Sequence, residues 1–241
     1  KAILAVHLYG QACNMTKIMN IAKKYNLKVV EDCAQSHGNH WNAKKVGTFG
    51  HVACFSFYPS KGCGAFGDGG CITTDNKELA KKFKVYRNYG SEKRYHNMII
   101  GSNSRLDEIQ AGLLRVKLKH LDELNDERCK IAERYLAEIN NPLVKLPKVR
   151  PNADSTWHQF VIHTSKRDEL QKYLADREIG TLIHYPIPPH LSEAYSYLGK
   201  IVGDYPIAEK YSKEVLSLPM YNGITDEEQT LIINAINEFR G

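Results

Sequence analysis

The chain has 241 residues, which suits one large domain or two smaller ones; 42% of them are hydrophobic and 25% are charged. The net charge of +6 is scattered, so we expect no nucleic-acid-binding arm, and no apolar run is long enough to cross a membrane. The six cysteines form no C-x-x-C pair and have no zinc-ligand spacing, which predicts a reduced, cytoplasmic protein without a metal site.

The first part of the chain alternates apolar strands with amphipathic helices. We expect strands at 2–6, 28–31, 51–57 and 70–74, and helices at 15–25 and 77–86. This alternation is typical of an α/β fold whose sheet is covered on both faces. Functional groups gather where the strands of such sheets end, and Asp32 and the stretch 56–61 both follow a predicted strand.

The rest of the chain predicts a smaller α+β unit. Helical spacing of apolar residues predicts one long helix or two joined helices over 106–139, with Ser104 as the N-cap. Further strands are expected at 157–164 and 181–184, and helices at 168–176 and 226–239, the last capped by Thr225. Three prolines make the segment 185–190 an extended loop.

Lys61 ends the segment SFYPSK (56–61) and directly precedes a glycine-rich run at 62–70, downstream of Asp32. Lysine is the side chain that forms an imine with an aldehyde, provided that its amine is partly deprotonated. The lysine precedes the glycines, so the order of a phosphate-binding P-loop is absent. Taken singly, Lys61 would be a surface lysine and Asp32 a turn residue. Their order favours an enzyme that holds an aldehyde cofactor as a Schiff base.

Several ordered motifs carry a family resemblance. They are VEDCAQSHG (30–38), VGTFG (46–50), FSFYPSK (55–61), GDGG (67–70), RNYG (87–90) and GSNSRLDEIQA (101–111). Over essentially its whole length the sequence closely resembles the DegT/DnrJ/EryC1 family of pyridoxal-phosphate (PLP)-dependent nucleotide-sugar aminotransferases. The resemblance implies a fold type I α/β transferase, with a PLP-binding large domain at 1–125 and a small C-terminal α+β domain at 126–241.

The resemblance also implies that the large domain is incomplete at its N-terminus. The family's chain extends well before Lys1, and the chain opens on an apolar run, KAILAVH, that predicts a strand already inside a sheet. The preceding part would carry further groups that bind the cofactor, so we expect weak cofactor binding without it.

The resemblance assigns a role to each of five residues. Lys61 would form the Schiff base with PLP and then carry a proton between the substrate carbon and the cofactor. Asp32 would pair with the pyridine nitrogen, Gln35 would hydrogen-bond near the ring hydroxyl, and Ser56 would bind the phosphate. Asn103 would reach a phosphate in the neighbouring subunit, so the active sites would be shared in a homodimer.

The segment 182–191 resembles that of enzymes that make 3-amino-3,6-dideoxyhexoses on dTDP. This implies amino transfer, with glutamate as the expected donor, to a dTDP-linked 3-keto-6-deoxyhexose, with Tyr185 and His190 in the substrate pocket. Packing of a proline-rich loop on the core explains these two residues equally well. The alternatives are a 4-keto substrate, a PLP-dependent sugar dehydratase, in which histidine replaces the lysine, and a catalytically silent regulatory relative.

Overall fold

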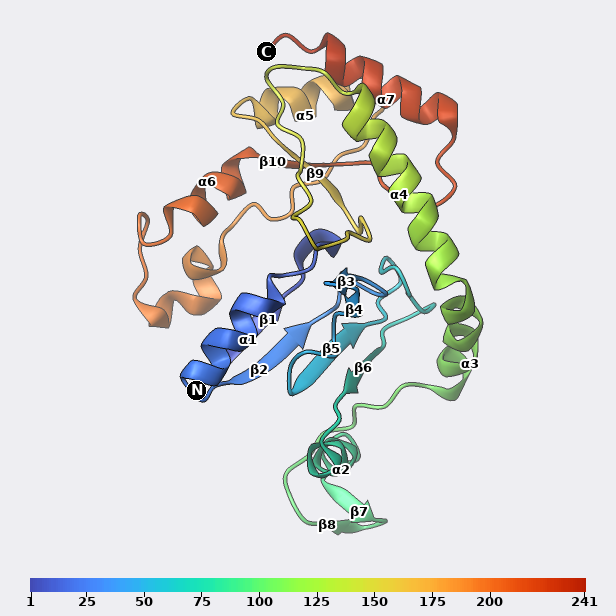
Figure 1. The fold of residues 1–241 in the computed structure, drawn as a ribbon, viewed down its shortest axis with the longest axis vertical. Helices are drawn as coiled ribbons and strands as arrows, with labels where there is room; N and C mark the ends of the chain where they lie inside the picture. Colours follow the sequence, from blue (N-terminus) through green and yellow to red (C-terminus); the bar gives the residue numbers. More distant parts are fainter. The chain divides into compact units, whose positions relative to one another are not determined.

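The computed structural model describes residues 1–241 and divides them into two compact units. The first unit comprises Lys1–Asp126 with Val149–His158, and the second comprises Glu127–Lys148 with Gln159–Gly241 (Figure 1). The residues 149–158, placed by sequence in the smaller domain, therefore pack with the first unit. The functional division of the chain after residue 125 stays a prediction.

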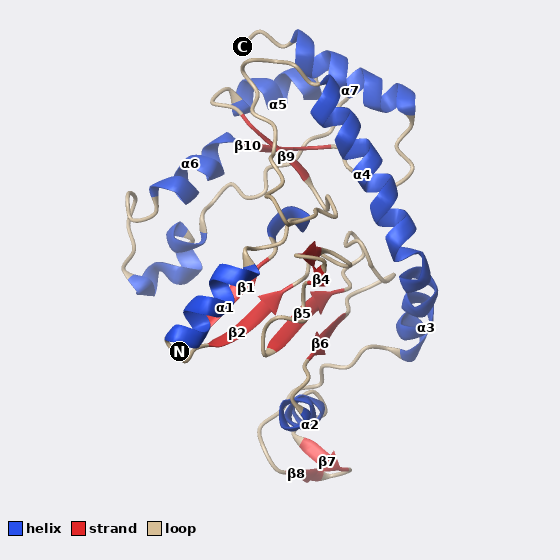
Figure 2. Cartoon of the chain, viewed as in Figure 1, coloured by secondary structure: helices blue, strands red, loops and turns tan.

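A four-stranded sheet organises the first unit (Figure 2). Its strands are β1 (Ala2–Val6), β2 (Lys28–Asp32), β5 (Val52–Ser56) and β6 (Gly70–Thr73), in that order across the sheet. The pairs β1–β2 and β2–β5 are parallel, whereas β6 is antiparallel to β5. The predicted α/β fold with a mostly parallel sheet is confirmed. Parallel pairing brings the carboxyl ends of β1, β2 and β5 to one edge.

The other elements of the first unit are helices and short hairpins. They are η1 (Leu8–Gly10), α1 (Met15–Lys24), β3 (His40–Trp41), β4 (Lys44–Lys45), α2 (Lys77–Tyr86), β7 (Ser91–Lys93), β8 (His96–Asn97), α3 (Glu108–Lys117) and η2 (Leu118–His120). Helix α1 begins where the side chain of Asn14 accepts a hydrogen bond from the backbone of Lys17 at 3.0 Å. The core of the unit includes the buried Met15, Val29 and Trp41.

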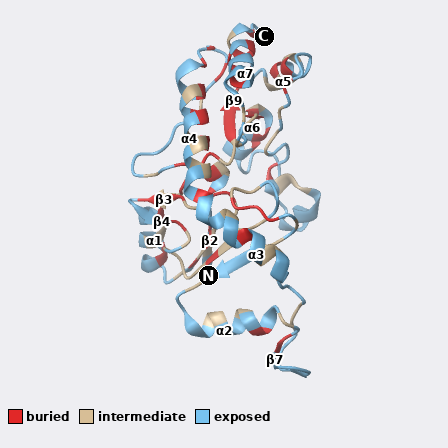
Figure 3. Ribbon diagram, turned by 90° about the vertical axis from the view of Figure 1, so that its right-hand side faces the viewer, coloured by how far each residue is buried: buried red, intermediate tan, exposed pale blue.

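Helix α4 (Leu121–Glu138) starts in the first unit and continues into the second. The second unit also contains β9 (Phe160–His163), α5 (Arg167–Ala175), η3 (Pro189–Leu191), η4 (Glu193–Leu198), α6 (Pro206–Glu214), β10 (Val215–Leu218) and α7 (Asp226–Glu238). Strands β9 and β10 pair antiparallel, and β9 is largely buried (Figure 3). The rings of Tyr135 and Phe160 pack at 5.1 Å in the core of this unit.

Some local predictions were right and others wrong. Thr225 caps α7 in a capping box with Glu228, as expected. Ser104 caps no helix, because α3 begins at Glu108 after the N-cap Asp107. The segment 181–184 forms only an isolated bridge between Leu182 and Ser217, since short apolar runs do not specify their pairing partner. Sequence analysis missed α6 and β10.

None of the helices combines the length and apolar character that a membrane crossing requires.

Candidate active site

Asp32 is the last residue of β2, at the sheet edge where the parallel strands end. It pairs in register with Val6 of β1 and Cys54 of β5. Its Oδ1 accepts a hydrogen bond from the backbone N–H of Ala34 at 3.0 Å, which fixes the carboxylate over the turn that follows. Asp32 is half-buried. The carboxylate of Asp32 is therefore held at the sheet edge and remains partly exposed there.

Glu31, the residue before Asp32, is completely buried and lies at the centre of a hydrogen-bond cluster. Its two carboxylate oxygens accept from the backbone N–H groups of Gly47, Phe49 and Gly50 at 2.6–2.8 Å. Burial disfavours the charged form, but the hydrogen bonds from His7 and from these amides are stronger and hold the pKa of Glu31 below its usual value. Glu31 thus ties the 46–50 turn to the strand that carries Asp32.

His7 joins the same cluster from the end of β1. Its Nδ1 accepts from the backbone N–H of Cys13 at 3.0 Å, which leaves Nε2 to carry the proton and donate to Glu31 at 3.2 Å. Ligand atoms of His7, Glu31 and Cys33 lie within 4.8 Å of one another, the spacing of a possible metal site. Because the carboxylate and the imidazole nitrogens already have partners, we assign this cluster a structural role. Glu31 belongs to the motif VEDCAQSHG, but the sequence predicted no role for it.

Gln35 is buried, and its side chain has a defined orientation. The backbone N–H of Tyr9 donates to Oε1 at 2.6 Å. An N–H group can only donate, so the oxygen of the carboxamide faces Tyr9 and the NH₂ group lies at the other end. The hydroxyl of Thr156 donates to the backbone carbonyl of Gln35 at 3.4 Å. The donor end of the Gln35 side chain is therefore the end that points away from Tyr9.

Lys61 lies in a tight loop that follows Ser56, the last residue of β5. The backbone N–H of Tyr58 donates to the hydroxyl of Ser56 at 3.2 Å, and the N–H of Lys61 donates to the carbonyl of Tyr58 at 2.9 Å. Gly64 closes the loop, since a Cβ there would lie 2.3 Å from the carbonyl oxygen of Pro59. The loop therefore has little freedom to move the lysine.

Burial lowers the pKa of Lys61 below its usual value, while the charge of Asp32 partly opposes the shift. The two side chains that the sequence paired are thus close enough to influence each other electrostatically. Lys61 makes no ion pair. A lysine with a lowered pKa has a larger fraction of the neutral amine, which is the nucleophilic form.

His37 lies beneath this loop. In the sequence it is the histidine of the motif VEDCAQSHG, and no role was predicted for it. It is 6% exposed, between the rings of Phe55 at 5.6 Å and Phe57 at 6.1 Å, and its nitrogens lack a hydrogen bond of ordinary geometry. Burial lowers the pKa of His37 to about 4; the backbone of Ser56 opposes this shift, and the charges of Lys61 and Lys117 add to it. His37 is therefore neutral at pH 7.

We expect His37 to make the protein sensitive to acid. Between pH 6.5 and about 4 the unfolded chain binds a proton at His37 that the folded chain does not, so stability falls as the pH falls. The expected loss is about 3 kcal/mol, reached near pH 4. Thermal unfolding across this range should show a shallower pH dependence in His37→Gln. The exposed histidine variant His120→Gln is the control, and an unchanged slope in His37→Gln would contradict the assignment.

Asn103 is exposed and lies on a loop with its own fixed geometry. It forms an isolated bridge with Asn88, and the guanidinium of Arg105 donates to the side chain of Asn88 at 2.9 Å. Gly101 makes this pairing possible, because a Cβ there would lie 2.1 Å from the backbone nitrogen of Gly90. The loop thus presents Asn103 outward on a rigid support.

The two predicted substrate residues belong to the second unit and differ in their surroundings. Tyr185 is 51% exposed, with its ring edge-on to His184 at 5.4 Å. His190 is largely buried: Nε2 lies 3.0 Å from Oε1 of Glu209, and its ring contacts that of Tyr205 at 4.8 Å. The internal partner of His190 favours the packing interpretation for this residue. A role for either residue in substrate binding stays a prediction.

The fold is that of part of a fold type I aminotransferase. The chain belongs to the DegT/DnrJ/EryC1/StrS aminotransferase family, whose family model matches residues 1–237. The family resemblance expected from the motifs is confirmed.

The chain is also similar to named proteins over almost its whole length. The chain is 51% identical over 239 residues to the dTDP-3-amino-3,6-dideoxy-alpha-D-galactopyranose transaminase of Aneurinibacillus thermoaerophilus. It is 42% identical over 240 residues to the dTDP-3-amino-3,4,6-trideoxy-alpha-D-glucose transaminase of Streptomyces venezuelae. The matches cover 99% of this chain but only 65% and 63% of the two relatives, so the chain spans just under two thirds of their length.

Solved structures agree with these matches. The structure of DesV from S. venezuelae superimposes with a TM-score of 0.96 at 42% identity and covers 99% of this chain, which in turn covers 64% of DesV. The structure of NtdA from Bacillus subtilis has a TM-score of 0.88 at 32% identity and covers 98% of this chain, which covers 55% of NtdA. The NtdA structure has PMP, the amino form of PLP, bound as its cofactor.

Proposed function

We propose that the protein is a PLP-dependent sugar aminotransferase that transfers an amino group from glutamate to a keto carbon of a dTDP-linked deoxyhexose. The observation that carries the proposal is the closeness of Asp32, at the carboxyl end of β2, to Lys61 in its tight loop: burial lowers the pKa of Lys61, and the charge of Asp32 is near enough to oppose that shift. These groups fit an aldehyde-bearing pyridine, because such a molecule needs a nucleophilic amine and an acceptor for its ring N–H.

The neighbouring donors complete the fit. The fixed carboxamide of Gln35 presents an NH₂ group that suits a ring hydroxyl oxygen, and the hydroxyl of Ser56 at the end of β5 suits a phosphate. The buried carboxylate of Glu31 accepts hydrogen bonds from Gly47 and Phe49, which connect the 46–50 turn to β2, the strand that ends at Asp32. The site therefore offers one group for each polar feature of the cofactor ring and its phosphate.

When bound, PLP supplies an electron sink that stabilises negative charge developing on the substrate carbon. Asp32 would hold a proton on the pyridine nitrogen, which strengthens that stabilisation. Lys61 would bind the cofactor covalently and, once its Nζ is released, accept a proton from the substrate and return it. Neutral His37, beneath the loop, places no second positive charge next to this amine at pH 7.

The exposed Asn103 supports a shared active site. Its loop is braced by Asn88 and Arg105, so the side chain can project from one subunit toward a cofactor phosphate in another. A homodimer accounts for an exposed polar residue that its own loop holds in a fixed position.

We place the new amine on carbon 3 of a 6-deoxyhexose. The support is the 51% identity to a relative named for a 3-amino-3,6-dideoxy sugar. A 4-keto substrate is the alternative position.

The natural full-length protein, incubated with PLP, glutamate and a dTDP-3-keto-6-deoxyhexose, is expected to form a dTDP-3-amino sugar together with 2-oxoglutarate. Mass spectrometry separates amination from dehydration, and NMR locates the amine. An amine on carbon 4 would correct the substrate, and loss of a hydroxyl without amine gain would indicate a dehydratase. The absence of either product, in protein that retains the cofactor, would favour the regulatory alternative.

A further inference from the structure

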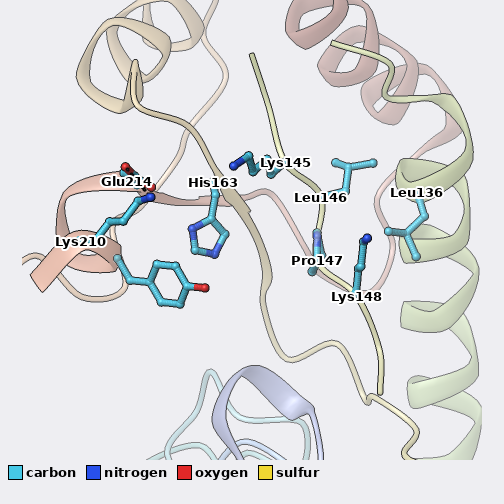
Figure 4. Close-up of a pocket in the computed structure, with 9 residues that line it drawn as sticks. Leu136, Lys145, Leu146, Pro147, Lys148, His163, Lys210 and Glu214 are labelled. Carbon is cyan, nitrogen blue, oxygen red and sulfur yellow. Dashed lines mark ion pairs between the residues drawn. The ribbon is translucent and has the colours of Figure 1, made fainter. Parts of the chain in front are cut away.

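A pocket of about 710 Å³ opens within the second unit, and the family function assigns it no role. Its walls come from α4, from the segment 145–148, from β9 and from α6 (Figure 4). The strand-like segment is held in place by paired backbone hydrogen bonds between Lys145 and His163, at 2.8 and 2.9 Å. The volume lies in the range typical of sites for small organic ligands.

The lining of the pocket is positively charged. Lys145, Lys148 and Lys210 line it, against the single carboxylate of Glu214 (Figure 4). Lys210 and Glu214 are 4.0 Å apart, the limit of an ion pair, and the lysine is 61% exposed, so this contact neutralises little of the charge. Lys145 has no ion pair. The excess of positive charge attracts an anion.

The imidazole of His163 projects into the pocket between these charges (Figure 4). Its ring lies 4.3 Å from that of Tyr211, edge-on, and its ring nitrogens have no hydrogen-bond partner. Burial lowers the pKa of His163, the charges of Lys145 and Lys210 lower it further, and Glu214 opposes them. The lowered pKa favours the neutral ring, which can donate one hydrogen bond to an anion.

The remaining lining is apolar. Leu136, Leu146 and Pro147 form one wall, and the ring of Tyr211 is 48% exposed. A bare inorganic anion would leave this surface in contact with water. A planar ring would cover it and could stack on the aromatic face.

We propose that this pocket binds a nucleoside diphosphate, with its phosphates between Lys145, Lys210 and His163 and its base against Tyr211 and the apolar wall. Charge-assisted hydrogen bonds supply the phosphate contacts and ring stacking supplies the base contact. The proposal is independent of the aminotransferase chemistry, since it uses residues of the second unit alone.

The test is a titration of the natural full-length protein with ADP, followed by NMR of the labelled histidine rings. We expect the His163 signals to shift at pH 7 and the pKa of His163 to rise, because the bound anion favours the protonated ring. Lys145→Ala and Lys210→Ala should each weaken ADP binding by about tenfold. The matched control is Lys213→Ala, an exposed lysine of α6 outside the pocket, which should bind ADP as the parent does.

Pyrophosphate distinguishes a nucleotide site from a general anion site. ADP should bind more tightly than pyrophosphate, and Tyr211→Leu should weaken only ADP binding. Equal affinity for the two probes overturns the nucleotide assignment. His163 signals that do not respond to millimolar ADP, or an equal loss in Lys213→Ala, overturn the site itself.

Discussion

Replacing Lys61 with alanine is expected to abolish covalent retention of PLP. It should also lower the rate of amino transfer by about 10²–10⁴-fold or more, since this is the range for loss of a proton-transfer group. The reason is chemical: alanine can neither form an imine nor move a proton. Lys61 has no ion pair and is only half-buried, so unfolding should change by less than about 0.5 kcal/mol. The loss would then belong to the site and not to the fold.

Covalent attachment of PLP can be measured without an activity assay. The PLP-loaded protein is reduced with borohydride, and its peptides are analysed by mass spectrometry. The cofactor should be found on the peptide that contains Lys61 in the parent protein and on no peptide of the variant. Lys45→Ala, which removes an exposed lysine of β4, serves as the control and should retain the cofactor. Equal retention in Lys61→Ala would show that another lysine holds the cofactor.

Replacing Glu31 with alanine is expected to destabilise the first unit by roughly 3–5 kcal/mol, the cost of breaking a buried charged network. The substitution leaves the N–H groups of Gly47, Phe49 and Gly50 without their acceptor inside the protein, and it removes the partner of His7. Since the pKa of Glu31 is lowered on folding, its contribution is present above its ordinary pKa and is lost as the pH falls.

Urea or thermal unfolding at pH 7 measures the effect. Glu123→Ala is the matched control, because that carboxylate is 75% exposed and pairs only with an exposed histidine, so its loss should cost less than about 1 kcal/mol. Glu31→Ala should also retain less PLP, because the strand that carries Asp32 loses its support. Equal stability of the two variants would rule out the anchoring role of Glu31.

Local sequence patterns predicted the four strands of the main sheet and the long helices of the first unit, but not the short hairpins β3–β4 and β7–β8. Strand β1 and helix α2 have the predicted bounds, and the capping of α7 by Thr225 was correct. These features depend on neighbours a few residues away, which sequence periodicity and capping preferences describe well. The missed strand β10 pairs with β9 across more than fifty residues, and its short apolar run specifies no partner by itself.

The same distinction applies to the candidate site. The order of Asp32 and Lys61 along the chain predicted a lysine-bound cofactor, and the several ordered motifs around them identified the family. The supporting contacts were not visible there: Glu31 bonds residues 16–24 positions away, and Asn125 donates to the carbonyl of His37 across 88 positions. No local pattern encodes such contacts, because the packing of separate elements creates them.

The sequence by itself therefore determined the family, the order of the main strands and long helices of the first unit and the identity of the candidate lysine. Only the tertiary structure decided that Lys61 has a lowered pKa, that the carboxamide oxygen of Gln35 accepts from Tyr9 and that His190 has Glu209 as an internal partner. The physical reason is that burial and hydrogen-bond direction depend on groups brought together by folding, whereas residue type and spacing are already fixed in the chain.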